Sequence, residues 1–316
     1  LLGGVVTGVV VALTLTDNKN PSPVPVPVPA ANSDTSVPIS PSPIMPPSLP
    51  IPVASPTAPP TQIPGTADIL LQDLEQWIIR TEQDRLAFED PSSPQALALA
   101  WLSSDNIALS EGRPISTVLE RYVAAVVYFA TDGPNWSRQD FNLLSELPVC
   151  DWNNQIPTDR AGTIGIFCEG MSSIRRVVFY DIGLTGTMPW ELSLLFDLQG
   201  LNLGMNALTG TLPTELGDLT NMDFLNVAMN NLTGTIPTEL MRMTLLANAY
   251  FSSNKLEGTI PSQIGGLTSL SLLQLADNLL SGSLPGELTQ LRTLTRLTLN
   301  HNDLIGSLPT ELGLLT

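Results

Sequence analysis

The chain contains two adjacent stretches, LQGLNLGMNALTGTLPTELGDLTN (198–221) and MDFLNVAMNNLTGTIPTELMRMTL (222–245), that carry one pattern in the same order. The period is 24 residues, and an asparagine, a glycine and a proline keep it through five copies. The three series are Asn206, Asn230, Asn254, Asn278 and Asn302; Gly210, Gly234, Gly258, Gly282 and Gly306; and Pro213, Pro237, Pro261, Pro285 and Pro309. A period of this length is typical of a solenoid built from stacked turns.

The repeated unit reads L-x-x-L-x-L-x-x-N-x-L-x-G-x-[IL]-P, which is the pattern of a leucine-rich repeat. Its alternating Leu-x-Leu segment predicts a short strand with one apolar face, as at Leu201 and Leu203. One turn cannot bury that face alone, so stacked turns are expected to form a parallel sheet over a shared core. The sequence therefore predicts an α/β solenoid: a right-handed leucine-rich-repeat superhelix with a concave parallel β-sheet. It comprises about six turns over residues 174–316, with the last one truncated.

The asparagine stands where the chain bends away from the strand. Its side-chain amide is expected to bond backbone groups of its own turn and of the neighbouring turn, which makes the series structural. A less regular copy of the repeat begins at Ile174, and it has Ile182 in the asparagine slot. This departure indicates a first turn that faces a cap instead of another turn.

Residues 1–16, LLGGVVTGVVVALTLT, carry no charge. As a helix they would span about 24 Å, short of the ~30 Å hydrocarbon core of a membrane. Two interpretations compete: the end of a transmembrane helix, or the apolar part of a cleaved signal peptide. The transmembrane helix is favoured because no clear small-x-small cleavage site precedes Asp17. Gly4 and Gly8 form a GxxxG pair, which would allow a homodimer of such helices.

Residues 17–65 are rich in proline and predict a disordered, extended stalk. Residues 66–173 are predicted to form a helical region and a cysteine-containing N-terminal cap. Ser93 before Pro94 indicates a helix start, Pro114 opens a further helix, and Asp132-Gly133-Pro134 ends it. An earlier helix is expected from apolar residues at helical spacing, namely Ile69, Leu70, Leu74, Trp77, Ile78 and Leu86.

Cys150 and Cys168 are the only cysteines, and a count of two does not establish a bond. Trp152, Gly165 and Ile166 accompany them in a pattern close to C-x-W-x-G-V-x-C, with an insertion after the tryptophan. This segment resembles the N-terminal cap of plant-type extracellular leucine-rich-repeat proteins. The preceding stretches SSPQALALAWL and LERYVAAVVYFATDGPNW look like those of algal (diatom-type) receptor-like repeat proteins, so the resemblance covers residues 93–316.

The resemblance implies three features. The first is a Cys150–Cys168 disulfide, formed in an oxidising compartment. The second is a cap that covers the exposed end of the core. The third is a second short strand on the flank of each turn, formed by the L-x-G-x-[IL]-P stretch.

The net charge of −17, from 30 acidic and 13 basic residues, argues against binding to nucleic acid and against docking on anionic lipid. The single histidine, His301, has no partner motif for a catalytic triad or a zinc site. No phosphate-binding, dinucleotide-binding or kinase signature occurs. The sequence therefore predicts no enzyme activity, no catalytic residue, no metal and no cofactor.

The variable positions of the strands are the candidate ligand-binding residues, because they form columns on the predicted concave face. Each of them also has a plain interpretation as a solvated strand residue. The candidates are Tyr180, Asp181, Asn202, Phe224, Asn226, Tyr250, Ser252, Gln274, Asp277, Thr298 and Asn300. Amide, hydroxyl and aromatic groups suit a protein, peptide or glycan ligand. Asn135-Trp-Ser and Asn231-Leu-Thr are N-glycosylation sequons.

These features predict an extracellular binding module, receptor-like or adhesive, on a protein that crosses the cell membrane once. Two alternatives remain open: a structural protein of the cell wall or matrix, and a secreted inhibitor of wall-degrading enzymes, which the resemblance also allows.

Overall fold

The computed structural model describes residues 10–12, 74, 78–106, 108, 114–139, 142–153, 164–169 and 173–307. The chain divides into two compact units, Leu1–Asp17 with Gly65–Thr316, and Asn18–Pro64. The second unit, which contains most of the predicted stalk, lies outside the described residues, as do Gly4 and Gly8. The described helices and strands all belong to the first unit.

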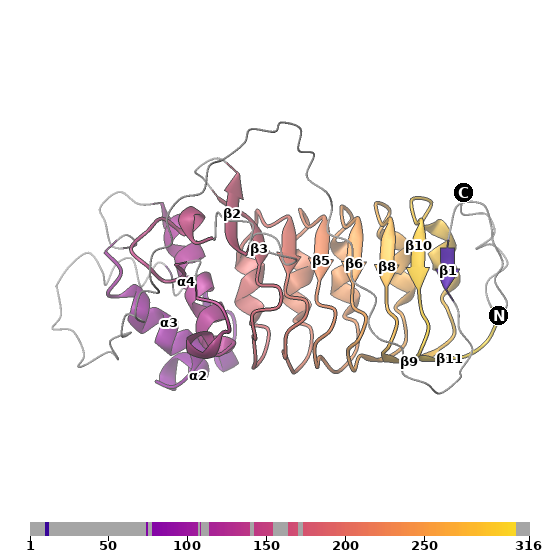
Figure 1. Ribbon diagram of the computed structural model, residues 1–316, viewed down its shortest axis with the longest axis horizontal. Helices are drawn as coiled ribbons and strands as arrows, with labels where there is room; N and C mark the ends of the chain where they lie inside the picture. Colours follow the sequence, from indigo (N-terminus) through magenta and orange to yellow (C-terminus); the bar gives the residue numbers. More distant parts are fainter. Residues whose placement is uncertain are drawn as a thin grey trace, which may run out of the picture. The chain divides into compact units, whose positions relative to one another are not determined.

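Each turn of the repeat contributes one strand to a sheet of order β1-β10-β8-β6-β5-β4-β3-β2 (Figure 1). The strands of the repeat are parallel and in register. They are β3 (Ser173–Val178), β4 (Gly200–Asn202), β5 (Phe224–Asn226), β6 (Asn248–Tyr250), β8 (Leu272–Gln274) and β10 (Arg296–Thr298). This register confirms the predicted leucine-rich-repeat solenoid.

The two edges of the sheet are formed by strands from outside the repeat. β2 (Gly165–Glu169) is antiparallel to β3 at one edge, and β1 (Val10–Ala12) is parallel to β10 at the other. β1 lies within the stretch predicted as a transmembrane helix, and the helix prediction is wrong for its three residues. β-branched valines suit a strand, and the edge of β10 offers them backbone hydrogen bonds. Within the described residues, no helix has the length and apolar character needed to cross a membrane.

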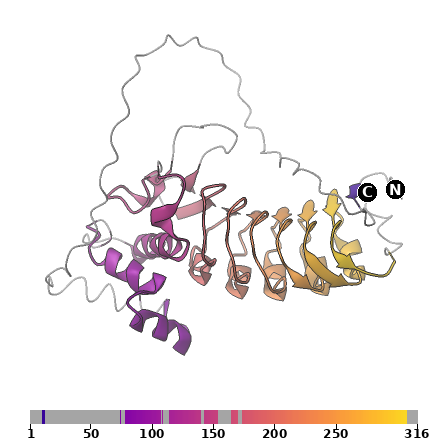
Figure 2. The same ribbon diagram turned by 60° about the horizontal axis from the view of Figure 1, so that its bottom comes forward.

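The side of the solenoid opposite the sheet carries a short 3-10 helix in each of the first five turns (Figure 2). Each 3-10 helix begins directly after a proline in extended conformation. They are η4 (Trp190–Leu194), η5 (Thr214–Asp218), η6 (Thr238–Arg242), η7 (Ser262–Gly266) and η8 (Gly286–Gln290). A second parallel sheet of β7 (Glu257–Gly258), β9 (Leu279–Gly282) and β11 (Asp303–Leu304) runs along the flank. This sheet confirms, for the last three turns, the second short strand that the resemblance implied for each turn. The first three turns have only isolated bridges at this place, between Thr187 and Thr209 and between Thr211 and Thr233.

The core is the stack of inward leucine positions. The predicted inward pairs are all at most 2% exposed: Leu201 and Leu203, Leu225 and Val227, Leu273 and Leu275, Leu297 and Leu299. In the fourth turn Ala249 and Phe251 replace the usual pair, so a small and a large side chain share the space. A cavity of about 20 Å³ remains beside them, and only apolar side chains line it.

Each asparagine of the series links two turns through its side-chain amide. Asn254 donates from Nδ2 to the carbonyls of Val227 (3.0 Å) and Phe251 (3.1 Å), and its Oδ1 accepts from the Leu232 N–H (3.0 Å). The Phe251 carbonyl also accepts from Asn278 (3.0 Å), so the contacts form a continuous chain. The same pattern recurs at Asn206, Asn230, Asn278 and Asn302. The predicted structural role of the series is confirmed.

Three helices lie at the end of the sheet that β2 and β3 occupy (Figure 1): α2 (Glu82–Glu89), α3 (Pro94–Leu102) and α4 (Ile115–Ala130). As predicted, the Ser93 side chain caps α3, accepting from the Ala96 N–H at 3.0 Å. The predicted ends of α4 at Pro114 and Asp132 are also confirmed. The placement of Leu86 with the buried Leu74 and Ile78 is wrong, because α2 begins only at Glu82 and leaves Leu86 50% exposed.

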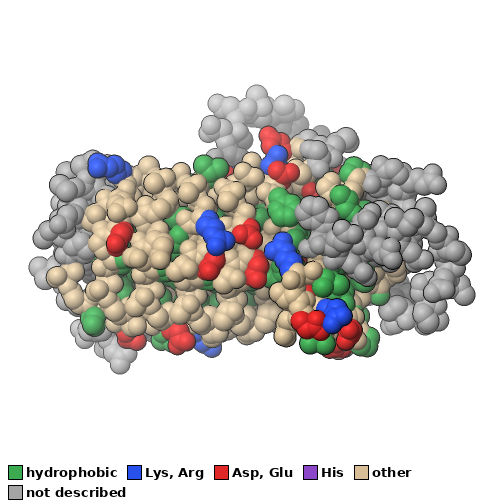
Figure 3. Space-filling view, turned by 180° about the vertical axis from the view of Figure 1, so that it is seen from behind, with side chains coloured by type: hydrophobic (Ala, Val, Ile, Leu, Met, Phe, Trp, Pro, Cys, Tyr) green, Lys and Arg blue, Asp and Glu red, His purple; other side chains and the backbone are tan. Residues whose placement is uncertain are grey.

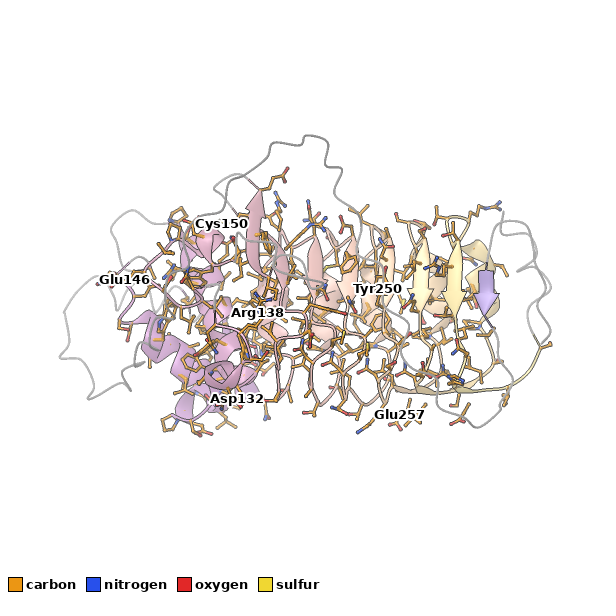
Figure 4. All side chains as sticks on the ribbon, in the orientation of Figure 1. Asp132, Arg138, Glu146, Cys150, Tyr250 and Glu257 are labelled. Carbon is orange, nitrogen blue, oxygen red and sulfur yellow. A yellow bond between two sulfur atoms is a disulfide. The ribbon has the colours of Figure 1, made fainter. Side chains whose placement is uncertain are left out.

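The irregular part of the cap is held by a disulfide and by one buried arginine. Cys150 and Cys168 are bonded, as the resemblance implied (Figure 4). Arg121 of α4 is completely buried, forms an ion pair with Asp105, and lies over the ring of Trp152 at 4.5 Å. Its guanidinium also donates to the carbonyls of Leu147 (2.8 Å) and Ser145 (3.0 Å). A single side chain of α4 therefore positions the loop that leads to the disulfide.

Candidate ligand-binding face

The outward face of the main sheet presents four columns of side chains, which run across the strands. Strand register defines the first two columns, and backbone hydrogen bonds between turns extend the alignment to the other two. The first is Arg176, Gly200, Phe224, Asn248, Leu272 and Arg296; the second is Val178, Asn202, Asn226, Tyr250, Gln274 and Thr298. The third is Tyr180, Gly204, Ala228, Ser252, Ala276 and Asn300; the fourth is Asp181, Met205, Met229, Ser253, Asp277 and His301.

All of the candidate residues lie on this face, but two of them are buried. Asn226 is 3% exposed and Tyr250 is 6% exposed, so neither has the solvated side chain that the plain interpretation of a strand residue gives it. Asn226 folds over Gly204, where a Cβ would lie 2.9 Å from its Nδ2, and its Oδ1 accepts from the Ala228 N–H at 3.0 Å. The ring of Tyr250, in the middle of the sheet (Figure 4), packs against Phe224 at 5.5 Å. Burial raises the pKa of the Tyr250 phenol.

The other candidates are at least partly exposed. Asp181 and Asp277 are exposed, and the remaining ones, half-buried in the sheet, are Tyr180, Asn202, Phe224, Ser252, Gln274, Thr298 and Asn300. The Tyr180 hydroxyl donates to the Met205 sulfur at 2.6 Å. The third column in the first turn therefore contacts the fourth column in the second turn. At the other end Asp277 and His301 form an exposed pair, with 2.6 Å between Oδ1 and Nδ1.

Sequence reasoning missed most of the first column. Arg176 and Arg296 are exposed, and Asn248 and Leu272 are partly exposed. Each stands directly before an inward strand position and two residues before a member of the second column. Because side chains alternate with a period of two in a strand, these residues lie on the same face as the second column. This alternation is the feature of the sequence that could have identified them. Arg176 lies 3.7 Å from Asp223, whereas Arg296 makes no ion pair with any described residue.

Two positions in every turn have a left-handed backbone, and they differ sharply in side chain. One is always glycine, at 186 and in the glycine series, with φ between 73° and 88°. A Cβ at Gly234, for example, would lie 2.8 Å from Thr211 Cγ2 of the preceding turn, so packing demands glycine there. The other is the fourth column, where φ is 53° to 58° and no residue is glycine. A side chain in this conformation costs roughly 1–2 kcal/mol, which glycine avoids.

Charge is not gathered into one patch on the back of the molecule. Figure 3 shows acidic and basic side chains next to each other on the described part of that face. Ion pairs between such side chains include Arg242 with Asp218 (3.2 Å) and Arg175 with Asp197 (3.2 Å), wherever they lie on the surface. The described residues contain no cluster of three or more His, Cys, Asp or Glu side chains suited to a metal ion.

Of the two sequon asparagines, Asn135 is exposed and Asn231 is half-buried. Asn135 lies in η1 (Gly133–Asn135) and donates to Asp132 at 2.9 Å.

The strand register, the asparagine chain and the outward columns define a leucine-rich-repeat protein. The plant peptide hormone receptor RGFR1, solved with RGF2, is 33% identical over 44% of this chain and 22% of its own, with a TM-score of 0.43. The ectodomain of the receptor kinase SOBIR1 from Arabidopsis thaliana is 27% identical over 51% of this chain and 91% of its own, at 0.44. The Arabidopsis receptor kinase HAESA, solved with the peptide hormone IDA and the co-receptor SERK1, is 26% identical over 61% and 35%, at 0.47.

The chain thus spans 22% of RGFR1 and 35% of HAESA. No protein-family model and no curated protein matches it. These TM-scores are below 0.5, so the fold assignment rests on the register and contacts within this chain.

Proposed function

We propose that this chain is an extracellular binding module, receptor-like or adhesive, and that its ligand is a protein, peptide or glycan bound on the outward face of the main sheet. The contact residues are the exposed and half-buried candidates together with the first column and the fourth column. Asn226 and Tyr250 support this surface from below. Glycans on Asn135 and Asn231 are part of the proposal, and so is the resemblance to algal receptor-like proteins.

The observation that carries the proposal is the contrast between the two left-handed positions. Glycine would relieve backbone strain throughout the fourth column, as it does in the glycine series. The chain instead keeps Asp, Met, Met, Ser, Asp and His there, all exposed or half-buried. Side chains that are retained at a cost in backbone energy and that make little core contact point to a role in recognition.

Placement outside the cell is supported by the disulfide, because such bonds persist in oxidising compartments and are rare in the cytosol. Glycans are supported by the exposure of Asn135, and less strongly by that of the half-buried Asn231.

The test is to probe peptide and glycan arrays with the full chain and with the double variant Met205→Gly/Met229→Gly. The variant should lose array signals at least tenfold. Its stability should change by less than about 1 kcal/mol, because relief of strain offsets the greater chain entropy of glycine. Loss of binding in a folded protein is the outcome that supports the proposal.

The matched control is Thr220→Gly/Thr244→Gly, which makes two exposed glycine substitutions in the same turns but away from the outward face. It should keep the array signals. If Met205→Gly/Met229→Gly binds as the unmodified chain does, the proposal is wrong, and if no peptide or glycan gives a signal with either protein, the ligand is neither of these two.

A further inference from the structure

A cavity of about 340 Å³ lies where the cap meets the first turn, apart from the outward columns that carry the proposed function. It is open to solvent on one side and bounded by α4, by the start of β3 and by the segment that follows η4. Leu119, Ile174, Leu195 and Phe196 provide apolar walls. A volume of this size is at the lower end of the range for small-molecule pockets, which is about 300–1,000 Å³.

The cavity has a buried carboxylate in its wall. Glu120 of α4 is 9% exposed, and its Oε1 accepts from the Ile174 N–H at 2.9 Å. Burial raises the pKa of Glu120, the hydrogen bond from Ile174 acts in the opposite direction, and the nearby charge of Asp197 raises the pKa further. A carboxylate in this position gains most from a cationic partner, which offsets the loss of water.

The charges around the cavity are unbalanced. Arg175 is the one basic residue among the lining side chains, and it is already engaged by Asp197, with 3.2 Å between Nη1 and Oδ1. Its Nε also lies 3.5 Å from a carboxylate oxygen of Glu169. The lining of the cavity therefore holds two carboxylates, Glu120 and Asp197, and one guanidinium, a balance that favours a cation over an anion.

We propose that this cavity is a binding site for a small amphipathic amine. The ammonium group lies against the carboxylates of Glu120 and Asp197, and the apolar body lies against Leu119, Leu195 and Phe196. Phe196 is 46% exposed and forms the accessible part of the wall, by which a ligand enters. The site is independent of the outward columns, so the Met205→Gly/Met229→Gly variant retains it.

Three probes of one shape and different charge test the proposal: 2-phenylethylamine, 2-phenylethanol and phenylacetate. Each is titrated calorimetrically into the full chain at neutral pH and low salt. The amine is expected to bind at least tenfold more tightly than the alcohol, and phenylacetate more weakly than either. Equal affinity for amine and alcohol, or no saturable binding of the amine, overturns the proposal.

Two variants separate charge from shape. Glu120→Gln keeps an acceptor for the Ile174 N–H, and it should remove the preference for the amine while leaving binding of the alcohol unchanged. Phe196→Ala alters an exposed side chain, and it should weaken amine and alcohol by the same factor. Leu245→Ala, at a 53% exposed leucine outside the cavity, is the control and should change neither. If Glu120→Gln does not fold, the comparison of probes and the Phe196→Ala variant still decide the matter, and an amine preference unchanged in a folded Glu120→Gln overturns the assignment.

Discussion

The first turn of the repeat and the turns inside the stack have the same sequence slots, but they use them for different contacts. In an internal turn, Asn230 bonds backbone groups of two turns. In the first turn Ile182 fills that slot, fully buried, while its N–H donates to Asn206 (3.1 Å) and its carbonyl accepts from Ser137 (2.8 Å). In the first turn this slot therefore bonds the cap through Ser137 and the second turn through Asn206.

The glutamate slot differs in the same way. Glu215, Glu239 and Glu287 of later turns are half-buried in the 3-10 helices opposite the main sheet. Glu191, in the first turn, is 1% exposed, because the cap helices cover it, and its Oε1 accepts from Gln95 at 2.7 Å. Internal turns are therefore stabilised by contacts that repeat from neighbour to neighbour, and the capped end by single contacts between distant parts of the chain.

The largest effect is expected where the cap depends on one side chain. Arg121→Met removes the partner of the buried Asp105 and leaves two carbonyls, those of Ser145 and Leu147, without their donor. An unpaired buried carboxylate typically costs about 3–5 kcal/mol. Urea denaturation followed by circular dichroism should show a loss of that size, and it should appear first in the helical signal because the helices lie in the cap.

Arg85→Met is the matched control, since Arg85 pairs with Glu82 on the surface of α2. Exposed pairs of this kind contribute about 0–1 kcal/mol, so the control should be nearly neutral. If the two variants lost the same stability, the cap would not depend on a buried ion pair.

The next largest effect is expected from breaking the periodic part. Asn254→Leu leaves the Leu232 N–H without its acceptor, and the carbonyls of Val227 and Phe251 each lose one of two donors. We expect a loss of roughly 3–4 kcal/mol, mostly from the buried N–H. Amide hydrogen exchange should show lost protection on both sides of residue 254, in the third and fourth turns.

Asn248→Leu makes the same chemical change six residues earlier, on the outward face. The described residues show no side-chain hydrogen bond for Asn248, so its replacement should cost less than about 0.5 kcal/mol. Equal losses of stability at the two positions would show that the hydrogen bonds of the Asn254 side chain contribute nothing specific to the stack.

The periodic half of the molecule could be predicted from the sequence because each of its contacts recurs with the period. The inward leucines and the asparagine contacts follow from the repeat pattern. In the cap, only the helix starts at Ser93 and Pro114 follow from local sequence signals. The capped half could not be predicted in the same detail. Arg121 meets Asp105, Ser145 and Leu147 through irregular chain whose path no period describes.

Burial at the candidate site was the least predictable property. Asn202 and Asn226 occupy one slot, yet only the second is buried. The two asparagines differ in the residue beside them, because the Asn226 side chain packs over Gly204, which has no side chain. Glu191 and Glu215 likewise share a slot and differ only in what covers them.

The smallest effect on stability is expected at Glu191. Because this effect depends on pH, it separates the first turn from the later turns most directly. Burial raises the pKa of Glu191 from 4.5 to about 7, the hydrogen bond from Gln95 opposes this, and the charges of Asp84 and Glu215 add to it. Between these two values the folded protein holds a proton that the unfolded chain has lost. The free energy of unfolding therefore falls as the pH rises from about 4.5 to 7, by roughly 2–3 kcal/mol in all, and is flat above.

Glu191→Gln replaces the ionisable carboxyl group with a neutral amide, so it should abolish this fall. The variant should be more stable than the unmodified chain above pH 8 and similar to it near pH 4. Denaturant titrations at a series of pH values measure the difference directly. Glu239→Gln, in the same slot two turns along and half-buried, is the control and should keep the fall with pH. If both variants had the same pH profile, burial by the cap would not distinguish the first turn from the turns that follow it.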